Sequence, residues 1–527
     1  MVNTRHKNAT KFDDEFDVIV VGYGFAGGIA AIEASDAGAR VLLLEKMQDP
    51  GGISICSGGG LRIDRNVDEA FAYLRATSAG TTPDDVLRVF AEGLAKLEDY
   101  LRKLASINGA KVLTRSRESN YPLPGYRSFE FLEIDSIPNF DATHEYPYAL
   151  PLRNGPKVFK VVQDNVNSRP ITVWLAAPAL RLVTNTAGGL AGVLVSRNGD
   201  EHLVKARRGV ILACGGFEAN SAMQRQYWQF FPVLPAMGRG NTGDGIRMAM
   251  ELGADLWHMW HFHGSYGFRH PDPKYGVGLR MKRLPDWTPG SKSSDVKMSW
   301  ILLDKHGGRF MNECPPYMQD TGHRPLDVYD PVTQSFPYVP AYILVDEIGR
   351  KMYPLGKMVF NDRNAKHYAW SDDNLKEVEL GILQRAQSIS ELAVRMKVAE
   401  RVLTNALARW NNQCEAGHDE DFGRPGWTMM PIKTPPYYFG EVWPMVSNTQ
   451  GGPVRDARQR VMNSFGEPIL GLFAAGELGS IWGHLYLSGG NLSECFITGR
   501  IAGREAAALA PWDGEPSVTR GVAPAFQ

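Results

Sequence analysis

The feature that most constrains the fold is a glycine-rich turn between two apolar runs near the start of the chain. Residues 16–21 form the first run, which breaks into Gly22-Tyr-Gly24-Phe-Ala-Gly27 and continues as an alanine-rich, helix-prone segment at 29–37. The second run, 41–44, ends on Glu45. Strand, glycines, helix, strand and acid in this order are typical of a dinucleotide-binding unit, whereas an isolated glycine cluster is usually only a turn. The chain is therefore predicted to bind a dinucleotide.

Each residue type in this unit has a mechanical role. Gly22 makes the tight turn, Gly24 lets a pyrophosphate approach the backbone, and Gly27 lets the helix pack closely on the strand. The helix N-terminus offers free N–H groups and a positive dipole end to the phosphates. We expect Glu45 to accept hydrogen bonds from a ribose.

The size and charge of the chain limit the class of protein. At 527 residues it is too long for one core, so we expect two large domains. Hydrophobic residues make up 43% and charged residues 22%, and a net charge of −1 gives no field that would recruit nucleic acid or an anionic membrane. No apolar stretch approaches the roughly 20 residues of a spanning helix, and residues 1–14 lack the apolar core of a signal peptide. We expect a cytoplasmic protein with no integral membrane segment and no nucleic-acid partner.

Cysteine and histidine spacing argues against a metal centre. The five cysteines lie far apart with no CxxC pair, at Cys56, Cys214, Cys314, Cys414 and Cys495. This pattern excludes a local zinc knuckle, an iron–sulfur run and a CxxCH haem site. His258, His261 and His263 are close in sequence, but no carboxylate or cysteine stands at ligand spacing. We expect these histidines to be structural or to line a substrate site.

The residue composition and the predicted secondary structure change twice along the chain. Residues 171–216 are strand-like and end on a glycine pair, whereas the following region carries prolines, aromatics and a long polar helical stretch at 389–413. An apolar strand then returns at 468–475, before Gly476 and Glu477. The predicted organisation is a nucleotide-binding domain at 1–277, an insertion at 278–440 and a return segment at 441–527.

Several further motifs are spaced along the chain. They are Gly51-Gly52, Gly58-Gly59-Gly60, Ala213-Cys-Gly-Gly-Phe217, Thr242-Gly-Asp-Gly245, Gly308-Arg-Phe-Met-Asn-Glu313, Ala475-Gly-Glu477 and Gly489-Gly-Asn491. Together with the first unit, they resemble the fumarate reductase/succinate dehydrogenase flavoprotein superfamily, and specifically its 3-ketosteroid dehydrogenase-like branch. The resemblance implies FAD rather than NAD. It also implies an α/β fold: a Rossmann-type FAD-binding domain with an inserted α+β substrate-capping domain.

The same resemblance implies the residues that bind FAD. They are Gly22, Gly24, Phe25, Ala26, Gly27, Glu45, Lys46, Gly52, Ser54, Ser57, Gly58, Gly59, Gly60, Ala213, Gly215, Gly216, Asn241, Thr242, Asp244, Gly476, Glu477, Asn491 and Leu492. Succinate dehydrogenases carry a histidine after the Gly51-Gly52 pair that bonds covalently to the flavin. Here residues 53–57 read Ile-Ser-Ile-Cys-Ser, so we expect non-covalent FAD.

The catalytic positions separate the branches of the superfamily. Fumarate reductases hold a dicarboxylate with arginines and histidines, which offer charged, bidentate donors. At the corresponding positions this chain has Tyr317, Leu487 and Ser447, and only His263 matches the substrate-side histidine of that family. We therefore expect dicarboxylates not to be substrates.

The replacements match 3-ketosteroid Δ1-dehydrogenases. By resemblance, Tyr317 removes the proton alpha to a ketone, and Tyr486 polarises the ketone oxygen together with the backbone N–H of Gly490. A supporting tyrosine is expected in the region before the strand-rich segment, where Tyr121 and Tyr126 both stand as candidates and Tyr121 is the one adopted. Preorganised donors for the developing enolate are the largest contribution available to such a reaction.

The favoured hypothesis is an FAD-dependent dehydrogenase that introduces a C=C bond next to a ring ketone. The alternative is an ene-reductase of the fumarate reductase-like type that acts on an enone or enoate. A flavoprotein binding module or electron relay is a third reading, against which the two tyrosines argue. The substrate stays open between a 3-ketosteroid and a single-ring keto acid such as an oxocyclohexane carboxylate. Arg280 and Arg283 could meet a carboxylate or be surface charge. The electron acceptor stays open between oxygen, a quinone and a redox protein.

Overall fold

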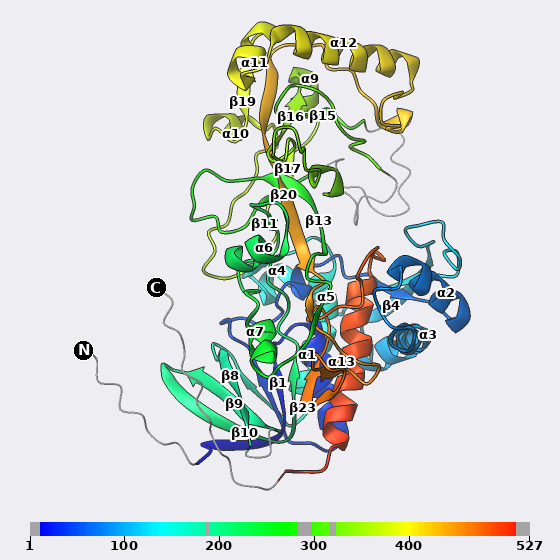
Figure 1. Cartoon of the computed structure of the whole chain (residues 1–527), viewed down its shortest axis with the longest axis vertical. Helices are drawn as coiled ribbons and strands as arrows, with labels where there is room; N and C mark the ends of the chain where they lie inside the picture. Colours follow the sequence, from blue (N-terminus) through cyan, green and yellow to red (C-terminus); the bar gives the residue numbers. More distant parts are fainter. Residues whose placement is uncertain (1–10, 186–188, 283–296, 316–322, 513–527) are drawn as a thin grey trace, which may run out of the picture.

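The computed structural model describes residues 11–185, 189–282, 297–315 and 323–512. Two eight-stranded sheets organise the chain. Figure 1 shows the first sheet, with β1, β10 and β23, towards one end of the long axis, and helices α11 and α12 at the other end. Within the described residues, none of the helices combines the length and apolar character needed to cross a bilayer.

The first sheet has a parallel centre with antiparallel additions. Its order is β22-β23-β10-β1-β2-β7, with β9 joined to β10 and β8 joined to β9. Neighbours from β23 to β7 run parallel, so the chain returns to this sheet near its C-terminus. The strands are β1 (Asp14–Val21), β2 (Val41–Leu44), β7 (Ile171–Trp174), β8 (Ala179–Thr184), β9 (Leu190–Arg197), β10 (Asp200–Leu212), β22 (Arg460–Met462) and β23 (Pro468–Ala474).

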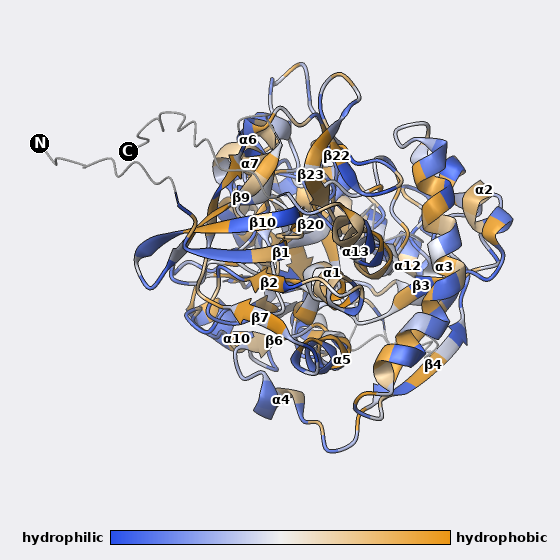
Figure 2. Cartoon of the chain, turned by 90° about the horizontal axis from the view of Figure 1, so that it is seen from below, coloured by the Kyte–Doolittle hydropathy of each residue, from blue (hydrophilic) through white to orange (hydrophobic). Residues whose placement is uncertain are grey.

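Three helices gather on the same side of β1, β2 and β7, as Figure 2 shows. They are α1 (Phe25–Asp36), α5 (Gly155–Asn167) and α13 (Gly490–Ala508). Helix α1 is buried from Phe25 to Ala34, and α13 packs directly against its backbone. A Cβ on Gly499 would lie 2.6 Å from the Ala26 carbonyl oxygen, and one on Gly503 would lie 2.4 Å from that of Ala30.

A smaller layer flanks this nucleotide-type unit. It contains a three-stranded sheet in the order β3-β5-β4 and two helices. The elements are β3 (Leu61–Ile63), α2 (Val67–Ser78), α3 (Asp84–Ala105), β4 (Lys111–Ser116) and β5 (Glu130–Ser136). Helix α3 buries Leu87, Phe90, Leu94 and Leu97, which recur every three or four residues along one face, as an amphipathic helix requires. Two short helices, α6 (Ser221–Tyr227) and α7 (Asp244–Glu251), follow the long strand β10.

The second sheet is built around one long strand. Its order is β15-β16-β20-β13-β14-β17, with β11 and β19 also paired to β20. The strands are β11 (Leu234–Pro235), β13 (Phe262–Phe268), β14 (Leu279–Met281), β15 (Trp300–Leu303), β16 (Ala341–Val345), β17 (Gly356–Lys357), β19 (Gln384–Ala386) and β20 (Tyr437–Thr449). The predicted insertion at 278–440 remains a proposal as a domain, and β13 and the end of β20 lie outside those bounds.

The helical stretch predicted at 389–413 is two helices. Helix α11 (Ile389–Met396) ends where Lys397 adopts a left-handed φ of 58°, and α12 (Glu400–Ala416) starts three residues later. Leu403, Leu407 and Trp410 of α12 pack in one core with Phe439 of β20. The remaining short elements are α4 (Ala142–Glu145), β6 (Ala149–Leu150), β12 (Leu256–Trp257), α9 (Glu347–Arg350), β18 (Phe360–Asn361), α10 (Leu375–Glu379) and β21 (Gly452–Pro453), and the single 3₁₀ turns Ser54–Cys56, Arg324–Leu326 and Gly426–Thr428.

Candidate active site

A cavity of about 1490 Å³ lies where the two sheets meet. Its walls come from the glycine-rich turn before α1, from the loop at 52–60, from the carboxyl end of β10 and from the start of α13. Strands β13, β14, β17 and β20 of the second sheet also line it, as do residues of the smaller layer, among them Arg62, Arg117 and Phe131. A pocket for one small ligand is typically about 300–1,000 Å³, so this cavity has room for a cofactor and a substrate together.

The glycine turn after β1 has the geometry that its sequence predicts. Gly22 has a φ of 105°, and a Cβ there would lie 2.5 Å from the Ala213 carbonyl oxygen. A Cβ on Gly27 would lie 1.8 Å from the Gly22 carbonyl oxygen, so the helix start and the turn are in direct contact. Gly24 and Phe25 face the cavity, and the N–H of Phe25 donates to Ser54 Oγ at 3.3 Å. The N-terminus of α1 therefore opens onto the cavity.

Charged side chains line the cavity next to this glycine turn and are fixed by hydrogen bonds and an ion pair. Glu45 accepts hydrogen bonds from the backbone N–H groups of Tyr23 and Met47, both at 2.9 Å. Burial raises the pKa of Glu45, and these N–H groups lower it. Lys46 Nζ lies 2.7 Å from an Asp244 carboxylate oxygen, which holds the start of α7 beside β2. The carboxylate of Glu45 thus faces the cavity in a fixed orientation.

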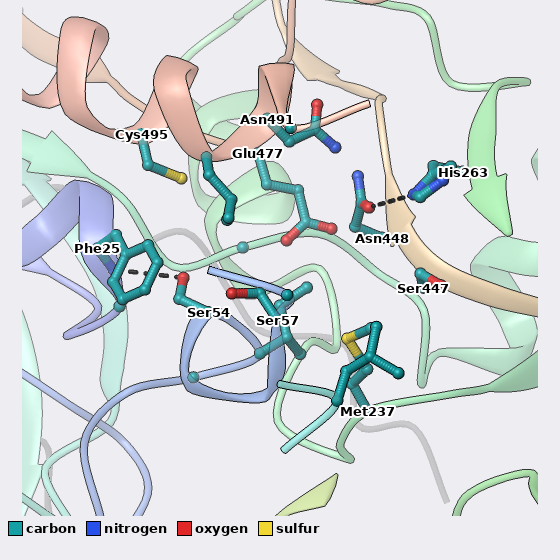
Figure 3. Close-up of a pocket in the computed structure, with 18 of the residues that line it drawn as sticks. Phe25, Ser54, Ser57, Met237, His263, Ser447, Asn448, Glu477, Asn491 and Cys495 are labelled. Atoms are coloured by element: carbon teal, nitrogen blue, oxygen red, sulfur yellow. Dashed lines mark hydrogen bonds between the residues drawn. The ribbon is translucent and has the colours of Figure 1, made fainter. Parts of the chain in front are cut away.

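A second polar group lines the cavity beneath α13. The Nδ2 of Asn241 donates to the carboxyl groups of both Glu218 and Glu477 at 3.2 Å, and the N–H of Thr449 donates to Glu477 at 2.8 Å. Burial raises the pKa of Glu477 well above its ordinary value, and the neighbouring Glu218 raises it further. Glu477 and Asn491 both line the cavity and are labelled in Figure 3. Among the described residues, neither side-chain polar atom of Asn491 has a hydrogen-bond partner, although both are buried.

Most of the predicted cofactor residues line this cavity. Those that do are Gly22, Gly24, Phe25, Ala26, Glu45, Lys46, Gly52, Ser54, Ser57, Gly58, Gly60, Ala213, Gly215, Asn241, Asp244, Glu477, Asn491 and Leu492. Those that do not are Gly27, Gly59, Gly216, Thr242 and Gly476. Two of these five contact residues close to the wall. A Cβ on Gly216 would lie 1.8 Å from Thr449 Oγ1, and Thr242 Oγ1 accepts a hydrogen bond from Lys46 at 2.8 Å.

The wall nearest β13 carries the predicted substrate-side residues. His263 and Tyr486 both line the cavity, and their ring centroids are 4.3 Å apart. His263 Nδ1 donates to Asn448 Oδ1 at 3.2 Å, a contact drawn in Figure 3. The hydroxyl of Tyr486 accepts a hydrogen bond from the Gly489 N–H at 3.1 Å. Ser447 also lines the cavity, whereas Leu487 is fully buried in the core.

The other three predicted catalytic residues are not seen on the cavity wall. Tyr317 lies outside the described residues, although Cys314 and Pro315, which precede it in the chain, line the cavity. Tyr121 does not line the cavity; it is buried in the core, where its N–H donates to the Tyr73 hydroxyl at 3.1 Å. Gly490 does not line it either, and its N–H donates to the Leu487 carbonyl at 2.6 Å. The role of the Gly490 N–H toward a ketone stays a prediction.

Comparison with known proteins adds to this geometry. Residues 17–492 match the protein family described as "FAD binding domain". The chain belongs to this family. It is 28% identical to the digoxin reductase of Eggerthella lenta over 95% of this chain and 88% of that protein. It is 26% identical to the cytochrome-type fumarate reductase of Shewanella frigidimarina over 94% and 77%.

A solved structure extends the likeness to a relative with a bound ligand. The structure is the 3-ketosteroid Δ1-dehydrogenase of Sterolibacterium denitrificans in complex with 1,4-androstadiene-3,17-dione. It is 25% identical, has a TM-score of 0.75, and the match covers 94% of this chain and 100% of that one. The predicted resemblance to this superfamily is confirmed, and the chain is an FAD-dependent oxidoreductase related to enzymes that act on CH–CH bonds.

The residues of this flavoprotein fit FAD. The free N-terminus of α1 and the glycine at Gly24 suit a pyrophosphate, and the carboxylate of Glu45 suits a ribose. The buried, unpartnered amide of Asn491 has the donor and the acceptor that a flavin or ribityl edge would satisfy. Glu477, fixed by Asn241 and Thr449, supplies another oxygen at the same wall. In the described part of the flavoprotein, no group of three or more histidine, cysteine, aspartate or glutamate side chains could hold a metal.

Two of the predicted histidines, and Arg324, which the sequence did not indicate, hold the chain before Tyr486. The segment before Tyr486 is held through three alternate carbonyls. His258 Nδ1 donates to the Ser480 carbonyl at 2.7 Å, and His261 Nδ1 donates to that of Trp482 at 2.7 Å. Arg324 donates to the carbonyl of His484. The histidines were expected to be structural or to line the site; nothing in the sequence indicated Arg324, because its partner is 160 residues away.

Asn448 and a group of cations were also missed. Asn448 directly follows Ser447, which the family resemblance had singled out. The position of Asn448 near the site could therefore have been predicted from its neighbour. Arg62 is nearly fully buried and donates to the carbonyls of Ser488 at 2.8 Å and Arg117 at 2.6 Å. Burial, and after it the neighbouring Arg117, lowers the pKa of Arg62 to about 9. No local motif marks such residues, because long-range folding brings them together.

Proposed function

We propose that this flavoprotein is a dehydrogenase that introduces a C=C bond alpha,beta to a ketone of a cyclic substrate. The observation that carries the proposal is the Tyr486–His263 pair on the cavity wall, in which His263 matches the substrate-side histidine of fumarate reductases and Tyr486 stands beside Leu487, which replaces one of their arginines. Ser447 at this wall and Leu487 in the core remove two of the expected charged groups. A wall of this kind suits a neutral oxygen that takes on charge only as the reaction proceeds.

The proposed division of labour follows from the chemistry of each group. Tyr486 donates its hydroxyl proton in a hydrogen bond to the ketone oxygen, and the Gly489 N–H that it already accepts strengthens it as a donor. As negative charge develops on that oxygen, the same bond becomes stronger, which lowers the barrier. Tyr317 is proposed as the base that takes the alpha proton. Bound FAD supplies the acceptor for the hydride that leaves the beta carbon.

We further propose that FAD binds without a covalent link. The residues at 53–57 include no histidine, and this loop borders the cavity through Ser54 and Ser57. The hydroxyl of Ser54 already accepts the Phe25 N–H, and that of Ser57 accepts the Gly59 N–H. These hydroxyls shape the loop, and neither residue is the histidine that bonds to the flavin in succinate dehydrogenases.

The second candidate is reduction of an enone by the same residues in the reverse direction. It is favoured by the 28% identity with a protein named digoxin reductase. A donor to the ketone oxygen and a proton carrier at the alpha carbon serve both directions by microscopic reversibility. The distinction therefore rests on which partner exchanges electrons with the enzyme.

The deciding experiment is anaerobic mixing of the purified yellow enzyme with a panel of cyclic ketones. Bleaching of the flavin band by a saturated ketone or a mono-enone supports the dehydrogenase. Bleaching by none of them, together with reoxidation of the chemically reduced enzyme by an enone, supports the reductase. Reoxidation by fumarate as fast as by the best enone would contradict both proposals.

A further inference from the structure

Strand β20 carries a β-bulge directly opposite His263. His263 of β13 is the cross-strand partner of Asn448, whereas the next residue of β13, Gly264, is the partner of Val446. Ser447 is therefore one extra residue on β20, without a cross-strand partner in the β13–β20 register. Bulges interrupt the ladder and re-aim a side chain, and they are over-represented next to active sites.

The bulge explains why two consecutive residues of one strand reach the same cavity. Successive side chains of a regular strand point to opposite faces. Ser447 and Asn448 nevertheless both line the cavity, and both are labelled in Figure 3 beside His263. The strands are tight at this point, because a Cβ on Gly264 would lie 1.9 Å from the Met445 carbonyl oxygen. The bulge therefore adds Ser447 to the wall that carries His263.

A second hydroxyl belongs to the same wall. Ser265 lines the cavity and stands two residues after His263 on β13, so both side chains point to one face of the strand. Two residues of strand span about 7 Å. Ser265 is paired with Met445, and Ser447 lies two residues further along β20, so the two serines are diagonal neighbours across the strands. Their hydroxyls are placed to meet one ligand group that lies between them.

The protein itself does not use these two hydroxyls. Ser265 is only 8% exposed and Ser447 only 5%, and among the residues that the structure describes neither hydroxyl has a hydrogen-bond partner. On the cofactor side of the cavity, by contrast, the hydroxyls of Ser54 and Ser57 each accept a backbone N–H. The apolar side chain of Met237 also lines the cavity, just after β11, which pairs with β20. Buried polar groups are normally hydrogen-bonded, so a ligand oxygen is the partner that this part of the wall lacks.

We propose that Ser265 and Ser447 form a specificity site for a second, uncharged oxygen of the substrate, a hydroxyl or carbonyl about 7 Å from the ring ketone at Tyr486. The proposal rests on the proposed function for the position of the ketone. Serine hydroxyls both donate and accept hydrogen bonds, so they suit either group. They carry no charge, whereas a carboxylate gains most from charged donors. The substrate is thus a cyclic ketone with a second neutral oxygen on the same ring or on the adjacent one.

Binding of product-like ligands tests the serine pair without turnover. Androsta-1,4-diene-3,17-dione is compared with its 6-oxo and 11β-hydroxy derivatives, and phenol, as the single-ring ligand, with 4-(hydroxymethyl)phenol. The method is anaerobic calorimetric titration of the FAD-loaded enzyme. At least one oxygenated ligand should bind about tenfold more tightly than its parent, which corresponds to one or two neutral hydrogen bonds.

Three serine variants show where this preference arises. Ser265→Ala and Ser447→Ala should each remove most of the preference and leave the Kd of the parent ligand unchanged, because the parent makes no hydrogen bond to either hydroxyl. Ser106→Ala removes an exposed hydroxyl at the end of α3, which donates to the Lys103 carbonyl at 2.7 Å. This control variant should keep the full preference.

The outcomes separate this proposal from the proposed function. The serine pair is overturned if no oxygenated ligand binds more tightly than its parent, or if Ser265→Ala and Ser447→Ala leave the preference intact. Loss of FAD or a shifted flavin absorption band in these variants would also overturn it, because the hydroxyls would then serve the cofactor. If the preference and its loss are both seen but no saturated ketone bleaches the flavin, the serine pair stands and the dehydrogenase proposal fails.

Discussion

The imidazole of His263 lies against the ring of Tyr486, with ring centroids 4.3 Å apart and the planes tilted by 42°. Each of the two residues also makes a hydrogen bond to a neighbouring residue. Asn448 accepts the His263 Nδ1–H at 3.2 Å, and the Gly489 N–H donates to the Tyr486 hydroxyl at 3.1 Å. The pair joins β13 of one sheet to the loop before α13, so the position of one ring depends on the other. This contact fixes where a substrate oxygen would meet the wall.

The first prediction concerns Tyr486. If its hydroxyl polarises the ketone, Tyr486→Phe should lower the rate of flavin reduction by about two to three orders of magnitude, the usual value of one oxyanion donor. Ketone binding should also weaken, since the hydrogen bond already exists in the ground state. Stopped-flow absorbance under anaerobic conditions measures both effects. Tyr342→Phe, a tyrosine on β16 outside the cavity, should behave as wild type, and equal rates for both variants would refute the role.

The second prediction concerns Tyr317, which the sequence motif alone assigns. Tyr317→Phe should nearly abolish flavin reduction by a ketone while leaving the Kd for the ketone almost intact, because only proton removal is lost. The same stopped-flow titration separates the limiting rate from the Kd. A Tyr317→Phe enzyme within a few-fold of wild type would mean that another group is the base.

The glycine turn gives a third prediction with a built-in control. Gly22 has a φ of 105°, and a Cβ would lie 2.5 Å from the Ala213 carbonyl oxygen, whereas Gly38 has a φ of 85° and open space around it. Gly22→Ala should therefore lose FAD, because β1 and β10 must separate where the cofactor binds. Gly38→Ala should keep FAD at the cost of backbone strain of about 1 kcal/mol. The ratio of flavin to protein absorbance after gel filtration reports the result, and full FAD content in Gly22→Ala would contradict it.

This contrast shows what the sequence could and could not predict. The role of Gly22 follows from a local pattern, since strand, turn and helix are contiguous in the chain. The position of Glu477 against Asn241 and Glu218 depends on β23 returning to β10, which the motif suggested but whose contacts it did not define. A helix break at Lys397 was missed because residues 389–413 contain no glycine or proline that would mark it.

Long-range packing set the limits at the substrate end. The family comparison singled out Tyr486 and His263, and the structure brings them together. The family resemblance did not predict that the Gly490 N–H donates to the Leu487 carbonyl, because this hydrogen bond depends on the local geometry of the helix start. The pairing of Arg280 with Lys357 joins residues 77 positions apart and carries no motif. Residues that act through spacing along the chain were predictable, and residues that act through register between strands were not.

The fourth prediction is that acid precipitation of the enzyme releases all of its yellow colour into the supernatant. The absence of a histidine at 53–57 is the reason, since this loop carries the flavin-linking histidine in succinate dehydrogenases. Absorbance of the supernatant and fluorescence of the redissolved pellet measure the split. A pellet that retains flavin fluorescence after washing would show a covalent bond.

The last prediction starts from the Glu218–Glu477 pair, which Asn241 bridges at 3.2 Å on each side. Burial raises the pKa of both carboxyl groups, and Glu218 further raises that of Glu477. In the unfolded chain a glutamate has a pKa of about 4.3. Between that value and the folded pKa, the folded protein holds more protons than the unfolded chain. The free energy of unfolding should therefore fall as the pH rises through this window.

Glu218→Gln keeps the shape of the side chain but removes one titrating group and its repulsion of Glu477. The variant should lose less thermal stability than wild type between pH 5 and pH 8, and the difference in Tm at the upper end should be of the order of 2 °C. Circular dichroism melting in excess FAD measures it, so that loss of cofactor does not distort the comparison. Glu441→Gln, an exposed carboxyl on β20, should run parallel to wild type. If Glu218→Gln also runs parallel to wild type across this range, the two buried carboxyl groups do not control the pH dependence of folding.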